Sequence, residues 1–230
     1  MCFAGEGKMQ VNIEKFQLNE RTHWRYFLEL EAELLSTRKY VDFDPANFNT
    51  FSIEYLKLYQ AVCSEIDAFG KILAAEINPE FVPGDTKNTV LKWWYEVQTW
   101  YQDIDKKTVT FCRSFDLEPW AGFLVEQYRD KNGGLRYRIQ NPNINHTPTW
   151  WKAYTDVKHQ RSLKDAKGNL NYQKANLGNL CLAVAALYIL EKNYFDQVGD
   201  ARNKAYMGKS EIFEPRHSTY EEGGTLFVGF

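Results

Sequence analysis

The longest apolar run in the chain, residues 177–190, constrains the fold more than any other feature of the sequence. From Leu180 onward its side chains would cover every face of a helix, and a helix of that kind is buried on all sides. Two asparagines, Asn176 and Asn179, interrupt its start, and the run is shorter than the roughly 20 apolar residues that cross a bilayer. We therefore predict a helix over residues 172–196 at the centre of the fold.

Other stretches repeat apolar residues at the three- and four-residue spacing of a helix face. The longest has Thr50 or Ser52 at its start as a candidate cap and ends at Asn78-Pro79, because the residue before a proline disfavours the helical region. Together with the apolar helix, these stretches predict a mainly α fold, an antiparallel bundle of about five helices. The additional helices are expected over residues 20–40, 52–77, 86–103 and 148–161.

Residues 108–140 carry a different pattern, with short β-favouring stretches in place of helical spacing. Asn132-Gly133 lies between two alternating stretches, which is typical of a two-residue hairpin turn. A turn centred on this pair would place Tyr128 opposite Tyr137. We therefore predict a small β-hairpin insertion at 108–140. The same register puts three arginines on one face: Arg129, Arg136 and Arg138.

The 230-residue chain has a formal net charge of -2. This balance argues against a broadly basic nucleic-acid-binding protein, and the length fits one domain. We expect residues 1–198 to form a single helical-bundle domain and residues 199–230 to form a C-terminal tail. Within the tail, residues 226–228 are candidates for an edge strand or for contact with a neighbouring subunit.

Cysteine and histidine usage gives no sign of a metal centre. The four cysteines include no Cys-x-x-Cys pair, and the histidines show no ligand spacing, so we expect no metal and no cofactor. The first residues lack the charged-then-apolar pattern of a signal peptide. These features favour a cytoplasmic protein without a membrane partner.

Chemistry-capable side chains gather in the predicted helix over residues 148–161. Asp156 and His159 are three residues apart and share one helix face. His159 is a candidate general acid or base, with Asp156 to orient its imidazole. Lys158 and Arg161 are candidates to hold a phosphate and stabilise developing negative charge. The alternative is a histidine that lies at the surface or bonds to a neighbouring helix.

Local charge around this helix favours a polyanion. Residues 150–174 contain six lysines and arginines against two aspartates, and cations that neutralise phosphates release counterions on binding. Trp93-Trp94 and Trp150-Trp151 are candidates to stack bases, and Trp151 and Tyr154 are candidates to line a binding site. Asn176 is a candidate polar contact or helix cap. A solvated helix end and ordinary core packing of the rings are the alternatives.

Glu65 lies inside the apolar stripe of the predicted helix over residues 52–77. A carboxylate in such a place either pairs with a cation or has a raised pKa. We expect Arg161 or Lys158 to be its partner. Glu65 then either positions the basic group of a catalytic site or forms a buried ion pair that joins two helices.

The last two predicted helices resemble those of bacterial HEPN-like bundles, and the first two are similar in pattern. The resemblance rests on Trp150-Trp151-Lys152-Ala153-Tyr154-Thr155-Asp156-Val157-Lys158-His159-Gln160-Arg161, on Ala175-Asn176-Leu177 with the apolar helix behind it, and on residues 27–35 and 51–71. It implies an antiparallel bundle, often a homodimer, in toxin–antitoxin or phage-defence settings.

Catalytic members of that superfamily are metal-independent RNases, which carry an arginine a short distance before a histidine. In this chain Arg161 follows His159 instead. Only the Lys158-His159-x-Arg161 cluster matches the catalytic residues of that superfamily in position and chemistry.

Two hypotheses follow. The first is a HEPN-like protein, homodimeric, that cleaves or binds RNA in a bacterial defence or stress setting. In this hypothesis His159 is the acid or base, Lys158 and Arg161 bind phosphate, and Glu65 positions the basic group. The second is a non-catalytic helical interaction module that binds a partner protein or a small ligand.

Overall fold

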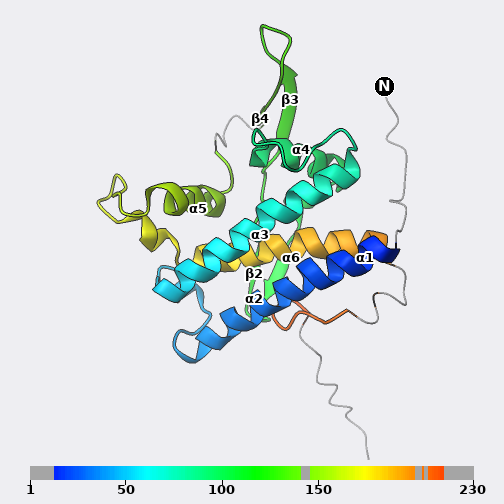
Figure 1. Cartoon of the computed structure of the whole chain (residues 1–230). Helices are drawn as coiled ribbons and strands as arrows, with labels where there is room; N and C mark the ends of the chain where they lie inside the picture. Colours follow the sequence, from blue (N-terminus) through cyan, green and yellow to red (C-terminus); the bar gives the residue numbers. More distant parts are fainter. Residues whose placement is uncertain (1–12, 141–145, 200–203, 205–206, 215–230) are drawn as a thin grey trace, which may run out of the picture.

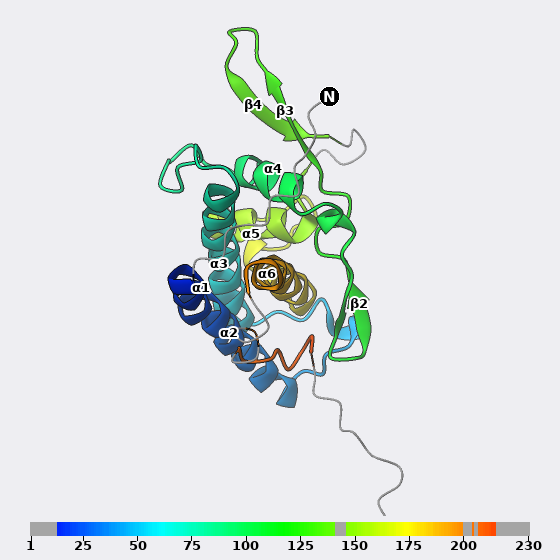
Figure 2. The ribbon, with the colours of Figure 1, turned by 90° about the vertical axis from the view of Figure 1, so that its right-hand side faces the viewer.

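A computed structural model describes residues 13–140, 146–199, 204 and 207–214 of the chain. The apolar run lies in α6 (Leu177–Val198), in which every residue from Ala183 to Glu191 is buried. Figure 2 looks almost along α6 and shows other elements on all sides of it. The prediction of a mainly α fold with this helix at its centre is confirmed.

Four of the other helices lie close to their predicted ranges, and one further helix lies before residue 20, where none was predicted. A π-helical turn (Glu20–Trp24) joins the first two of them without a break. Of the two candidate caps, Ser52 caps α3, because its hydroxyl accepts a hydrogen bond from the Tyr55 N–H at 3.0 Å. These helices are α1 (Ile13–Asn19), α2 (Arg25–Ser36), α3 (Ile53–Ile77), α4 (Val90–Trp100) and α5 (Thr149–Gln160).

The two longest helices, α3 and α6, pack against each other and begin at the same end of the molecule. At that end the Leu177 N–H donates to the Thr50 carbonyl at 2.9 Å. At the other end the Tyr194 hydroxyl donates to Glu76 at 3.4 Å. These helices therefore run parallel, whereas the sequence predicted antiparallel neighbours. The long connection through α4, the strands and α5 allows the parallel arrangement.

The predicted β insertion holds two hairpins in its described residues rather than one. β1 (Val109–Phe111) pairs with β2 (Phe115–Leu117), and β3 (Val125–Arg129) pairs with β4 (Leu135–Ile139), both antiparallel. In Figure 1 the β3–β4 hairpin projects away from the helices, and Figure 2 shows β2 at the outer side of the molecule, beyond α6.

The register of β3–β4 is one residue away from the prediction. Tyr128 lies opposite Arg136 rather than opposite Tyr137. A slip of one residue moves side chains to the other face of a strand. Arg129 consequently shares a face with Leu135 and not with the other two arginines, so the predicted three-arginine face is wrong.

Asp130 explains the different register. Its carboxylate accepts hydrogen bonds from the N–H groups of Asn132 and Gly134, both at 2.9 Å. Gly133 has a φ of 78°, in the left-handed region that glycine adopts without strain. The loop therefore takes in Lys131 as well, and three-residue loops with a left-handed glycine are the next common hairpin class after two-residue turns.

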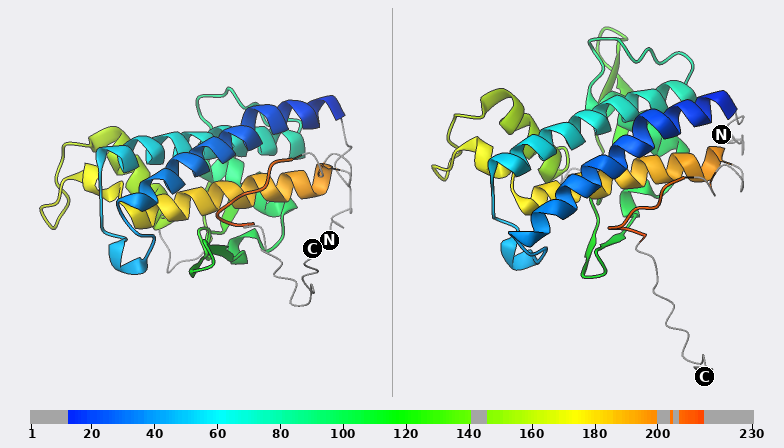
Figure 3. Two further views of the ribbon diagram at one scale, coloured as in Figure 1. Left: turned by 90° about the horizontal axis from the view of Figure 1, so that it is seen from below. Right: turned by 60° about the horizontal axis from the view of Figure 1, so that its bottom comes forward.

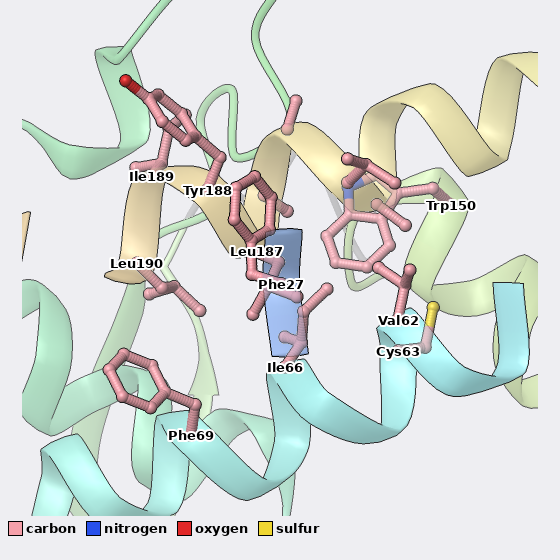
Figure 4. Packing of buried hydrophobic residues seen from close by; sticks show 14 of the residues in the cluster. Phe27, Val62, Cys63, Ile66, Phe69, Trp150, Leu187, Tyr188, Ile189 and Leu190 are labelled. Atoms are coloured by element: carbon pink, nitrogen blue, oxygen red, sulfur yellow. The ribbon is translucent and has the colours of Figure 1, made fainter. Parts of the chain in front are cut away.

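A cluster of buried tryptophans joins α4, α5 and the segment between the hairpins. Trp94 and Trp120 stack with ring centroids 4.1 Å apart, and Trp150 packs edge-on against Trp120 at 5.1 Å. The indole N–H groups of these three rings donate to backbone carbonyls, which satisfies their polar atoms inside the core. Figure 4 shows Trp150 beside the α3–α6 contact, where Phe69 and Leu190 approach each other.

Part of the predicted tail packs on the bundle. The buried Glu31 carboxylate on α2 accepts hydrogen bonds from the Ser210 hydroxyl and from the N–H groups of Glu211, at 2.8 Å, and Ile212, at 3.1 Å. Burial raises the pKa of Glu31, although these hydrogen bonds oppose the shift. Figure 3 shows the segment lying against the helices. The predicted strand at 226–228 lies outside the described residues.

Gly70 allows the close approach of α3 to α4. A Cβ at this position would lie 2.7 Å from the Trp93 ring, which is fully buried and has no free space to move into. Gly70→Ala is therefore expected to lower the free energy of unfolding by about 1–3 kcal/mol, although alanine favours a helix by about 1 kcal/mol. Urea unfolding measures this difference.

Gly84→Ala is the matched control, because a Cβ at Gly84 would meet nothing within 4 Å. Equal stability of the Gly70→Ala protein and this control would contradict the packing account.

Candidate functional site

The C-terminal end of α5 carries the predicted catalytic residues. The helix turns Trp150, Tyr154 and Val157 toward the core, whereas Lys158, His159 and Arg161 are exposed. Figure 1 shows α5 and the loop after it on the side of the molecule where α3 and α6 begin. Throughout the described part of the chain, the side chains of His159 and Arg161 have no hydrogen-bond or ion-pair partner.

Asp156 does not orient the His159 imidazole. Its Oδ2 atom lies 2.7 Å from the Lys174 Nζ and 3.4 Å from the Lys152 Nζ. Burial raises the pKa of Asp156, but the hydrogen bond and charge of Lys174, aided by Lys152, outweigh burial and lower it overall. The aspartate is therefore an ionised partner of two lysines, and the predicted Asp156–His159 pair is not formed.

The residues that were predicted to bind a ligand instead pack in the core or cap a helix. Trp151 and Tyr154 are each only 7% exposed, and their rings pack against one another with centroids 5.4 Å apart. No base can stack on rings that are covered in this way. Asn176 caps α6, since its side chain accepts a hydrogen bond from the Asn179 N–H at 3.0 Å. Lys158 lies over the Tyr154 ring, with its Nζ 5.5 Å from the centroid.

Four cations around the end of α5 form a group that we call the α5 cation cluster. All four are exposed, and none has a carboxylate within ion-pair distance among the residues described. The nearby Asp165 accepts hydrogen bonds from the N–H groups of Lys167 and Asn169, both at 2.9 Å. The cluster consists of Lys158, Arg161, Lys164 and Lys167.

A groove of about 290 Å³ adjoins the α5 cation cluster. One wall comes from the residues before α3, with Asn49 and Phe51. The other comes from the residues before α6, with Asn169, Gln173 and Asn176. We call it the amide groove, because four of these side chains are carboxamides.

Glu65 pairs with His23 and not with a residue of α5. Its Oε1 atom lies 2.5 Å from the His23 Nδ1, and the two side chains are 11% and 15% exposed. The Phe69 ring covers the imidazole, with centroids 5.1 Å apart. The expected partners Arg161 and Lys158 are therefore wrong. The expected pairing between two helical segments is found, since His23 lies in the π-helical turn, although the pair is only partly buried.

Glu191 on α6 is a buried carboxyl near this pair. It is 0% exposed, and neither of its oxygen atoms has a hydrogen-bond partner in the described structure. Burial raises its pKa well above the ordinary value, and the charge of Glu65 raises it further. Sequence reasoning missed Glu191 and His23, although a single carboxylate directly after the apolar run was a visible signal.

The described residues include no group of three or more His, Cys, Asp or Glu side chains that could hold a metal ion. None of the described helices is long and apolar enough to cross a membrane. No family model, curated protein or solved structure matches the chain. The resemblance to HEPN-like bundles therefore remains a prediction.

The unpaired Glu191 makes a prediction about pH. A carboxyl whose folded pKa is raised stabilises the fold fully below its unfolded pKa of about 4.3 and loses that contribution as the pH rises through the folded pKa. Glu191→Gln cannot titrate. Its free energy of unfolding should therefore rise relative to wild type between pH 5 and pH 8, which urea unfolding at each pH measures.

Glu33→Gln is the control, because Glu33 is exposed on α2 and should change the pH dependence little. Parallel pH curves for wild type and Glu191→Gln would contradict a raised pKa at this position.

Proposed function

We propose that this protein binds single-stranded RNA through the α5 cation cluster and does not cleave it. The observation that carries the proposal is the set of four exposed cations without carboxylate partners in the described residues. They occur in a chain whose formal net charge is -2. Exposed, unpaired cations attract phosphates and release counterions when they bind them, whereas cations that are already paired with a carboxylate gain less from binding a phosphate.

The arrangement around His159 argues for binding over cleavage. A general acid or base works from a fixed position within hydrogen-bond reach of the reacting group. Asp156, the expected orienting group, is held by Lys152 and Lys174, and Glu65 is held by His23. His159 therefore lacks its predicted orienting group, and Arg161 and Lys158 lack the carboxylate that was expected to position them. We assign His159 a place beside the phosphates without a catalytic role.

The test uses the alanine variant of all four cluster residues and a fluorescent single-stranded RNA in EDTA. Because this variant neutralises up to four fewer phosphates, it should bind RNA at least tenfold more weakly at low salt. The slope of log K against log salt should also fall by about 0.7 for each phosphate that is no longer neutralised. Fluorescence anisotropy across a salt series measures both quantities.

A control variant removes the same charge elsewhere, through alanine at Lys57, Lys87, Lys106 and Lys131, which are exposed and lie outside α5. Equal weakening of RNA binding in the two variants would reject the α5 surface as the site. Absence of RNA binding by wild type at low salt would favour the interaction-module hypothesis.

Cleavage is tested in the same samples. We expect the RNA to remain intact after prolonged incubation in EDTA, and gel electrophoresis of the samples measures this. Cleavage that His159→Ala abolishes would replace this proposal with the RNase hypothesis. Homodimerisation, which the HEPN-like resemblance implies, also remains a prediction, and analytical ultracentrifugation tests it.

A further inference from the structure

The amide groove has an exposed aromatic ring in its wall. Phe51 is 40% exposed and lies at the groove. Its ring is held edge-on by Tyr172, with centroids 5.4 Å apart and planes at 86°. A perpendicular contact of this kind covers at most one face of the Phe51 ring, and every nucleobase can stack on a ring face that stays open.

Polar groups in the same groove can read a base. The side-chain amides of Asn49 and Gln173 have no hydrogen-bond partner within the described ranges. A carboxamide offers two donors and an acceptor, and single-stranded RNA is recognised by hydrogen bonds to the edges of its unstacked bases. The groove therefore joins a stacking surface to free amides.

The backbone keeps the groove walls together. Phe51 and Asn176 form an isolated antiparallel bridge, and the Leu177 N–H donates to the Thr50 carbonyl at 2.9 Å. A second bridge, between Lys164 and Leu170, closes the loop that carries part of the α5 cation cluster. Asp165 of that loop lines the groove, so the loop that carries Lys164 and Lys167 borders it.

We propose that the amide groove takes one unstacked base of single-stranded RNA, with Phe51 as the stacking surface and Asn49 and Gln173 bonding to the base edge. The proposal rests on the proposed function, because the α5 cation cluster would hold the neighbouring phosphates. It adds a base-dependent component to a binding surface that charge alone would leave indifferent to the bases.

The experiment compares Phe51→Ala with wild type on two probes of equal length, a single-stranded RNA and an oligonucleotide of abasic ribose phosphates. Phe51→Ala should weaken binding to the RNA about tenfold. It should leave the salt slope and the affinity for the abasic probe unchanged. Phe51→Trp should restore RNA binding, because indole also stacks on bases.

Tyr128→Ala is the matched control, since Tyr128 is an aromatic residue of similar exposure, 38%, on the β3–β4 hairpin. It should leave binding to both probes unchanged. Thermal unfolding of each variant checks that the fold is intact.

A failure of the base-binding groove can be distinguished from a failure of the proposed RNA binding. One outcome is that the four-residue cluster variant loses RNA binding while Phe51→Ala binds RNA as tightly as wild type. This outcome would reject the amide groove as a base-binding site and leave the proposed function intact. If Phe51→Ala lowers the affinity for both probes equally, the amide groove is also rejected as a base-binding site. The Phe51 ring would then affect binding only by stabilising the fold. If wild type binds neither probe at low salt, the proposed function fails first.

Discussion

The burial of α6 against α3 is the contact on which the rest of the structure depends. Each fully buried aliphatic or aromatic side chain contributes about 1.5–3 kcal/mol, and α6 buries side chains on all its faces. Because both helices begin at the same end, the segments before them lie side by side and pair at Phe51 and Asn176. The amide groove and the end of α5 are therefore consequences of one helix contact.

The chemistry of α5 follows from how its residues divide between core and surface. Its tryptophans fix the helix in the cluster with Trp120, and its polar end extends past the packed region. Asp156 is taken by two lysines, so the remaining cations stay without counter-charge. The core, by contrast, contains the unpaired Glu191, whose pKa is raised by burial and which is therefore expected to lower stability as the pH rises.

What the sequence could predict was local. The apolar run alone placed α6 at the centre, and Ser52 marked the start of α3, because helix burial and capping depend on neighbouring residues. The hairpin register could not be read in the same way, since the Asp130 side chain decided against the two-residue turn.

The site was harder to predict because its contacts join distant segments. Glu65 was recognised as a carboxylate in need of a partner, but nothing in the spacing singled out His23, which lies 42 residues away. The cationic character of α5 was visible in the sequence, whereas the amide groove was not, since its walls come from residues before two different helices. Trp151 and Tyr154 were correctly predicted to lie on this helix, but the structure shows them on its buried face and not in a binding site.

The most direct test of RNA binding at the end of α5 is photo-crosslinking of the protein to a single-stranded RNA that contains 4-thiouridine. Mass spectrometry of the peptides then identifies the crosslinked residues. The account predicts crosslinks in the loop that follows α5 and at Phe51. Crosslinks confined to the β3–β4 hairpin or to α1 and α2, or crosslinks at the loop that persist in the four-residue cluster variant, would contradict it.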